Sequence, residues 1–212
     1  AALPPGVARA GPSGRDRDAR AGLLAGAGPG LPVIAAIFSP LTIAKKLCPG
    51  RFEAYLATDR RAVETAVQAI AATVRAFAER AIGLGCAGVF FAIQDATPAV
   101  GAETYAALGR PYDLAALEGA RGGWCNAIHL HGDDVLFELS PTSTAEYRAR
   151  GGTKAVPGGI RRYNLTRGDV AGLAEDIAAA RAADGARGVL FGPGCVIRHP
   201  VNLDVLNQVA AH

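Results

Sequence analysis

Short hydrophobic runs alternate along the chain with longer stretches in which hydrophobic residues recur every three or four positions. The runs at 31–38 (LPVIAAIF) and 87–93 (AGVFFAI) are continuous and contain β-branched or aromatic residues, which is typical of strands buried on both faces. Residues 59–84 between them carry hydrophobic side chains at helical spacing, and Gly83 and Gly85 predict the end of that helix. The pattern therefore predicts parallel strands connected by helices.

The second half of the chain continues this alternation less regularly. Further strands are predicted at 126–131, 154–160 and 188–191, and helices at 103–108, 113–121, 167–183 and 203–211. Residues 134–139 fit either a short helix or a strand, so the count is five or six strands, whereas a closed (β/α)8 barrel has eight and usually about 250 residues. We therefore expect an α/β, TIM-barrel-like fold that is incomplete. Residues 1–30 are expected to be a poorly defined segment and residues 31–212 the barrel domain.

The chain is organised around residues 126–134 (NAIHLHGDD), which are predicted to form a strand that ends in a chemical site. Alternate residues of a strand share a face, so His129 and His131 point one way while Ile128 and Leu130 point the other. We expect the hydrophobic pair to pack under a helix and the two imidazoles to point into the sheet's interior. Such a pair suits a metal or proton-transfer site, and it equally suits two hydrogen-bonded core histidines.

Other polar residues follow the predicted strands at their carboxyl ends, where ligands bind in parallel α/β folds. Gln94 follows the second strand, and Cys195 closes a Gly-Pro-Gly-Cys turn after the last strand. Asp133 could accept the second N–H of a metal-bound imidazole, although an acidic residue in a loop needs no such role. Asp113 is predicted to cap the helix that begins beside it.

Composition excludes several classes of function. Half of the 212 residues are hydrophobic, and the net charge of +3 comes from scattered basic residues, so a nucleic-acid surface is not expected. The longest weakly polar run, at 81–93, is too short and glycine-rich to span a bilayer. The four cysteines include no CxxC pair, and reduced thiols are expected. These features predict a soluble, cytoplasmic protein.

With its segments in this order, the sequence resembles the uroporphyrinogen decarboxylase-like superfamily, whose members are (β/α)8 barrels. The stretches that carry the resemblance are 37–44 (IFSPLTIA) with Lys46 and Leu47, 88–94 (GVFFAIQ), 103–105 (ETY) with 109–113 (GRPYD), 126–132 (NAIHLHG), and 192–195 (GPGC) with 200–203 (PVNL). They cover about residues 31–139 and 153–210. The Ser-Pro-Leu-Thr turn and the closing Gly-Pro-Gly-Cys are more similar to the cobalamin-dependent methyltransferase branch than to the true decarboxylases.

In that branch a zinc ion is held by a His-x-Cys pair and a later Cys, and it activates a thiol as methyl acceptor. The resemblance implies that His129 is the first ligand and Cys195 the last, with His131 standing where the branch has cysteine. Imidazole is a good zinc ligand, so the set is chemically sound, but it makes the site less rich in thiolate than the branch's own. The expected catalytic residues are Gln94, His129, His131 and Asp133, and the expected metal ligands are His129, His131 and Cys195.

The resemblance leaves three functions open. The first is zinc-dependent methyl transfer that involves a thiol or a corrinoid presented by a partner protein. The second is decarboxylation of a uroporphyrinogen-like tetrapyrrole in porphyrin biosynthesis, but the decarboxylases' arginine-rich amino-terminal segment has no counterpart here. The third is a non-catalytic barrel that binds a tetrapyrrole or a partner. The chain also has no room for one internal strand and loop between residues 139 and 154, and exposed strand edges would favour a homodimer.

Overall fold

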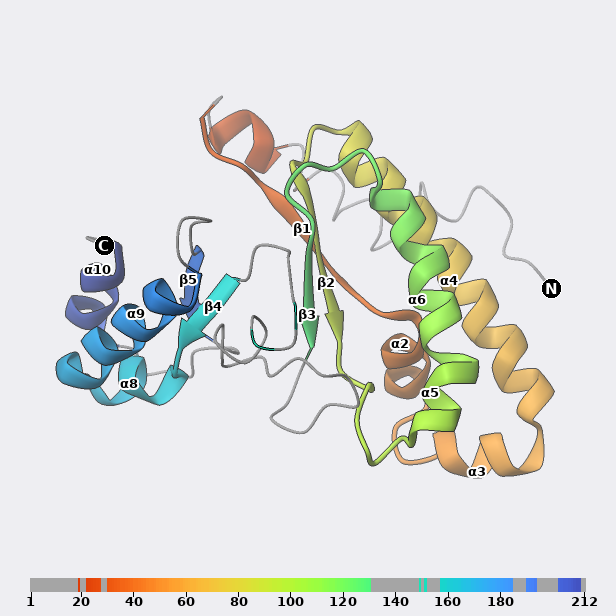
Figure 1. The fold of residues 1–212 in the computed structure, drawn as a ribbon. Helices are drawn as coiled ribbons and strands as arrows, with labels where there is room; N and C mark the ends of the chain where they lie inside the picture. Colours follow the sequence, from red (N-terminus) through yellow and green to blue (C-terminus); the bar gives the residue numbers. More distant parts are fainter. Residues whose placement is uncertain are drawn as a thin grey trace. The chain divides into compact units, whose positions relative to one another are not determined.

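A computed structural model describes residues 19, 22–27, 30–130, 149, 151, 157–184, 190–193 and 202–210. The chain divides into two compact units (Figure 1). Unit 1 comprises Ala1–Asp95 and Val100–His129, and unit 2 comprises Ala96–Ala99 and Leu130–His212. None of the helices in the described ranges is long and hydrophobic enough to cross a bilayer.

The sheet of unit 1 has three strands in the order β1 (Ile34–Phe38), β2 (Gly88–Ile93) and β3 (Ala127–Leu130). β1 and β2 are parallel, with Ile34 opposite Gly88 and Phe38 opposite Ala92. The arrows of β2 and β3 also point the same way in Figure 1. The predicted α/β class with parallel strands is therefore confirmed.

One face of this sheet is the core of unit 1. The odd-numbered residues Ala35 and Ile37 of β1 and Val89, Phe91 and Ile93 of β2 are all less than a tenth exposed. Helix α4 (Arg60–Gly83) contacts both strands and buries a stripe of small and β-branched residues, as its helical spacing predicted. Burial of a side chain as large as Phe91 contributes about 2–3 kcal/mol. The strong pattern of the sequence thus places this core correctly.

Shorter helices surround α4 on that side of the sheet. They are α2 (Pro40–Leu47), α3 (Phe52–Thr58), α5 (Ala102–Leu108), α6 (Arg110–Leu117) and the 3-10 turn η1 (Glu118–Ala120). Ser39 caps α2, because its Oγ accepts a hydrogen bond from the Thr42 N–H, and Pro40 suits the first helical position. Asp59 caps α4 in the same way through the Ala62 N–H.

Asn126 fixes where β3 begins. Its Oδ1 accepts from the Val89 N–H at 3.0 Å, and its Nδ2 donates to the carbonyl oxygens of Ala120 and Gly123, both at 2.8 Å. Gly88 lets the chain pass this close, since a Cβ at Gly88 would clash with the backbone of Cys125. The start of the predicted histidine strand is therefore held by a side-chain clamp.

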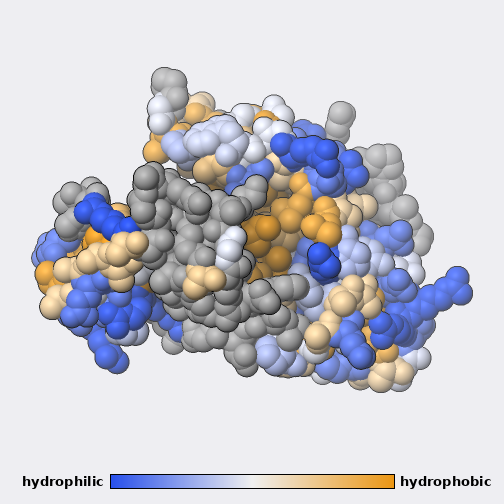
Figure 2. All heavy atoms as spheres, viewed as in Figure 1, coloured by the Kyte–Doolittle hydropathy of each residue, from blue (hydrophilic) through white to orange (hydrophobic). Residues whose placement is uncertain are grey.

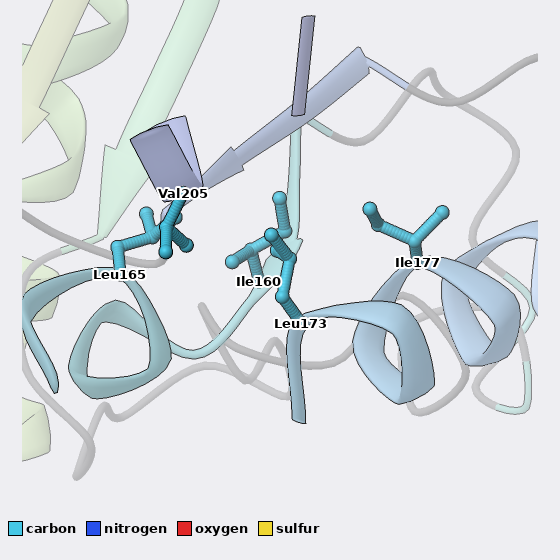
Figure 3. Close-up of a cluster of buried hydrophobic side chains, with 5 residues drawn as sticks. All are labelled: Ile160, Leu165, Leu173, Ile177 and Val205. Atoms are coloured by element: carbon cyan, nitrogen blue, oxygen red, sulfur yellow. The ribbon is translucent and has the colours of Figure 1, made fainter. Parts of the chain in front are cut away.

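Unit 2 contains a parallel pair of strands, β4 (Pro157–Ile160) and β5 (Leu190–Pro193). Its described helices are α8 (Arg162–Arg167), α9 (Val170–Asp184) and α10 (Leu203–Ala210). Five buried side chains from β4 and these helices form its core (Figure 3): Ile160, Leu165, Leu173, Ile177 and Val205.

A buried carboxylate ties β4 and α8 to α9. Asp176 is 7% exposed and accepts hydrogen bonds from the Arg161 N–H and Nε–H and from Asn164 Nδ2, at 2.7–2.9 Å. These three donors replace the water that the carboxylate loses on folding. The network therefore orders the turn between β4 and α8.

The observed elements differ from the predicted ones in several places. The helix predicted at 167–183 is confirmed as α9, which begins at Val170. The short helix α8 before it was not predicted; it ends at Gly168, which adopts a left-handed conformation (φ 73°). Strand β4 contains the last four residues of the strand predicted at 154–160, and residues 154–156 lie outside the described part of the chain. Ile128 is 56% exposed rather than packed under a helix; β3 lies at the edge of the sheet that the described residues form.

Barrel closure is not observed in the part of the chain that the structure describes, where the strands form separate sheets of three and two. The incomplete barrel therefore stays a prediction, and so does the single barrel domain at 31–212.

Candidate functional site

His129 lies on the sheet face opposite the helices. It is the third residue of β3 and is half-buried, and its ring stacks on Phe90 with centroids 5.3 Å apart and planes 24° apart. Phe90 lies on β2 between the buried residues Val89 and Phe91, so it points away from the core. The strand alternation that the sequence predicts thus agrees with where the His129 ring is found.

Gln94 follows β2 directly, and its backbone is held by α2. Its N–H donates to Thr42 Oγ1 at 3.1 Å, and Thr42 Oγ1 also accepts from Ser39 Oγ at 2.9 Å. Ser39 and Thr42 are at most 1% exposed, so this hydroxyl pair is sheltered from water. The Ser-Pro-Leu-Thr turn therefore connects the carboxyl ends of β1 and β2.

Asp95, the next residue, is paired with a lysine of α2. The Lys45 Nζ lies 3.2 Å from Asp95 Oδ1 and 3.3 Å from Glu53 Oε1. The pKa of Glu53 is lowered by a backbone hydrogen bond and by Lys45. Because Asp95 is only 14% exposed, its ion pair with Lys45 is the less screened of the two.

Asp113, on α6, is a buried carboxyl group whose pKa is affected by Asp95. The Asp113 residue is 4% exposed, and its Oδ2 accepts a hydrogen bond of 2.5 Å from the Tyr105 hydroxyl. Its Oδ1 has no hydrogen-bond partner among the described residues. Burial raises the pKa of Asp113 to about 6; the Tyr105 hydrogen bond opposes this shift, and the negative charge of Asp95 adds to it. Burial and the nearby Asp113 raise the pKa of Tyr105 as well.

This arrangement corrects the predicted cap. Helix α6 begins at Arg110 with Gly109 as its N-cap residue, so Asp113 lies within the first turns of α6 instead of before them. Pro111 fits the start of a helix, where its missing N–H is not needed. Sequence reasoning missed the Tyr105–Asp113 pair, since the two residues lie on different helices and only tertiary packing joins them. The one available signal was Gly109 between them, where a Cβ would clash with the Tyr105 ring.

His129 on β3 and Gln94 directly after β2 are well separated along the strand direction. His129 lies beside Phe90, and Gln94 follows Phe90 by four residues, about 13 Å along a strand. His131, Asp133 and Cys195 lie outside the described residues. Within the described ranges, no three His, Cys, Asp or Glu side chains lie close enough together to hold a metal ion. The ligand set His129, His131 and Cys195 therefore stays a prediction.

Comparison with solved structures finds a similar fold in a methyltransferase from Methanosarcina mazei. The TM-score is 0.82 at 17% sequence identity, and the match covers 100% of this chain and 66% of that chain. No family model matches the sequence, and a search of curated proteins finds no match. At this identity the likeness establishes a shared fold. This chain spans just under two thirds of the length of that methyltransferase.

Proposed function

We propose that this protein is a zinc-dependent methyltransferase of the uroporphyrinogen decarboxylase-like superfamily. The reaction would involve a thiol as the methyl acceptor or a corrinoid carried by a partner protein. The observation that carries the proposal is the position of His129 on the exposed face of a parallel sheet, in a chain with the fold of a methyltransferase. The motifs that resemble the cobalamin-dependent branch support it.

The donor set fits a catalytic zinc ion. Two imidazoles and one thiolate, from His129, His131 and Cys195, are all ligands that zinc accepts, and three protein ligands leave a fourth position for a reactant. Zinc bound there would supply a thiol or water of lowered pKa as a nucleophile at neutral pH. The stack on Phe90 restricts the orientation of the His129 ring, as a metal ligand requires.

The protein's own groups have separate roles in this proposal. Asp133 would accept the N–H of a ligand imidazole and so fix which ring nitrogen faces the metal. Gln94 offers an amide that can hydrogen-bond the reactant, and the Thr42 hydroxyl holds its backbone in place. The Lys45–Asp95 ion pair anchors the next residue to α2. These contacts would keep Gln94 and Asp95 in place during the reaction.

Methyl transfer can be tested with the full chain, methylcobalamin as donor and a small alkyl thiol as acceptor. The loss of the methylcobalamin absorbance should depend on the protein, stop after treatment with a chelator and return when zinc is added. Cys195→Ala should abolish the reaction. Cys48→Ala is the matched control, because Cys48 lies at the end of α2 and its Sγ–H donates to the Ala44 carbonyl oxygen.

Decarboxylation is the competing function, and a second assay with uroporphyrinogen as substrate tests it. Release of CO2 from uroporphyrinogen that is indifferent to chelator, without any methyl transfer, would replace the proposal by the carboxy-lyase function. Turnover in neither assay would favour a non-catalytic binding protein.

A further inference from the structure

The sheet face that carries His129 is hydrophobic, and its part on β1 is exposed. On β1 its members are Ile34 (37% exposed), Ala36 and Phe38 (42% exposed), and on β2 the most prominent is Phe90. Figure 2 shows hydrophobic side chains gathered over the region where Figure 1 draws these strands. A large hydrophobic side chain is costly to leave in water, so the exposure of Phe38 indicates a binding surface.

Aromatic rings on this face offer stacking surfaces. Phe38 and Phe90 lie on neighbouring strands, since Ala36 is opposite Phe90 and Phe38 is two residues farther along the same face. The His129 ring extends the row onto β3. The row crosses three strands, about 10 Å, which matches a ligand of one or two aromatic rings and is narrow for a tetrapyrrole macrocycle.

A positive charge lies beside Phe38, at the carboxyl end of β1. The exposed Lys46 on α2 reaches back over Phe38, with its Nζ 4.9 Å from the ring centroid. Its neighbour Lys45 is paired with Asp95 and Glu53, whereas no carboxylate among the described residues pairs with Lys46. Lys46 is therefore available to an anion that sits beside the Phe38 ring.

We propose that this face binds a small aromatic carboxylate, with its ring against Phe38 and Phe90 and its carboxylate towards Lys46. A ligand with both groups matches the hydrophobic row and the Lys46 ammonium at once, as neither a neutral aromatic nor an aliphatic acid does. The inference names a substrate class for the proposed methyltransferase. It rests on that function only for the ligand's role as a substrate, because the groups that bind the ring and the carboxylate, Phe38, Phe90 and Lys46, are not among the proposed zinc ligands.

Calorimetric titration of the full chain with three probes tests this site. Benzoate should bind more tightly than benzyl alcohol, which lacks the charge, and more tightly than cyclohexanecarboxylate, which lacks the aromatic ring. Lys46→Gln should weaken benzoate binding about two- to fivefold and leave benzyl alcohol unchanged. Phe90→Leu keeps a hydrophobic side chain and should weaken benzoate about two- to tenfold. Arg60→Gln, on the exposed side of α4, is the matched control and should change nothing.

Equal affinity for the three probes, no benzoate binding at millimolar concentration, or loss of binding in Arg60→Gln to the same extent as in Lys46→Gln would overturn the proposal. Tight tetrapyrrole binding that Lys46→Gln and Phe90→Leu leave intact, with no binding of benzoate, would also overturn it. Thermal melting of each variant separates a lost site from a lost fold. Benzoate binding without methyl transfer would contradict the proposed function alone, whereas methyl transfer without benzoate binding would contradict this inference alone.

Discussion

Replacing Asp113 by asparagine should make the protein's stability less dependent on pH. Asp113 is almost fully buried, and its pKa of about 6 lies well above the ordinary value of 3.8, chiefly because burial disfavours the charged form. Asparagine has nearly the same shape and carries no charge at any pH. Its side-chain oxygen can still accept the hydrogen bond from Tyr105.

The size and sign of this pH dependence follow from the difference in proton binding between the folded and the unfolded chain. Between pH 3.8 and about 6 the folded chain holds a proton on Asp113 that the unfolded chain has lost, so stability falls as the pH rises through this window. The interval between the two pKa values corresponds to about 3 kcal/mol. The stability of Asp113→Asn relative to the wild type should therefore increase by about 2–3 kcal/mol between pH 4 and pH 7.5.

Urea unfolding of both proteins at several pH values measures this difference. Far-ultraviolet circular dichroism follows the unfolding of unit 1, to which Asp113 and the long helix α4 belong; the only tryptophan in the sequence, Trp124, is 77% exposed and would report little. Comparing the variant with the wild type removes the contribution of every other titrating group. A constant stability difference across this range, or one that shrinks as the pH rises, would refute the assignment of Asp113 as a carboxyl group whose pKa is raised by folding.

Three further substitutions test the packing described above, each by the same urea titration. Asn126→Ala removes three hydrogen bonds that hold the start of β3 and should cost about 2–3 kcal/mol; no loss would mean that the strand is placed by other contacts. Phe91→Ala leaves a cavity under α4 and should cost about 3–5 kcal/mol, whereas a loss below 1 would contradict the described core. Asp176→Ala, followed by circular dichroism, should destabilise unit 2 by about 2–3 kcal/mol, since it leaves Asn164 buried without its acceptor.

The parts of the fold that the sequence predicts well are those with the strongest hydrophobic pattern. β1, β2 and α4 bury a continuous face, and every turn of α4 repeats the same periodicity, so local pattern and tertiary burial agree. The helix predicted at 167–183 is found as α9, but α8 before it was not predicted, because a helix of 6 residues carries too few hydrophobic positions to show helical periodicity. Ile128 fails for another reason: alternation predicts the two faces of a strand, and only the tertiary structure tells which strand lies at an edge.

The candidate site is predictable to a similar extent. Alternation along β3 is enough to predict the face of His129, and the role of Gln94 in a site stays a prediction. The pair of Asp113 and Tyr105 could not be predicted, since its raised pKa values arise from burial where α5 packs against α6. The hydroxyl contact from Thr42 to the Gln94 backbone is also a tertiary contact, between residues 52 positions apart.

The central claim is that one zinc ion is held by His129, His131 and Cys195, and elemental analysis of the purified full chain tests it most directly. We predict about one zinc per chain in the wild type and in Cys48→Ala, and loss of zinc in His131→Ala and in Cys195→Ala, with all four proteins folded by circular dichroism. A folded wild type without zinc after purification in zinc-containing buffer, or both ligand variants retaining the metal, would contradict the claim.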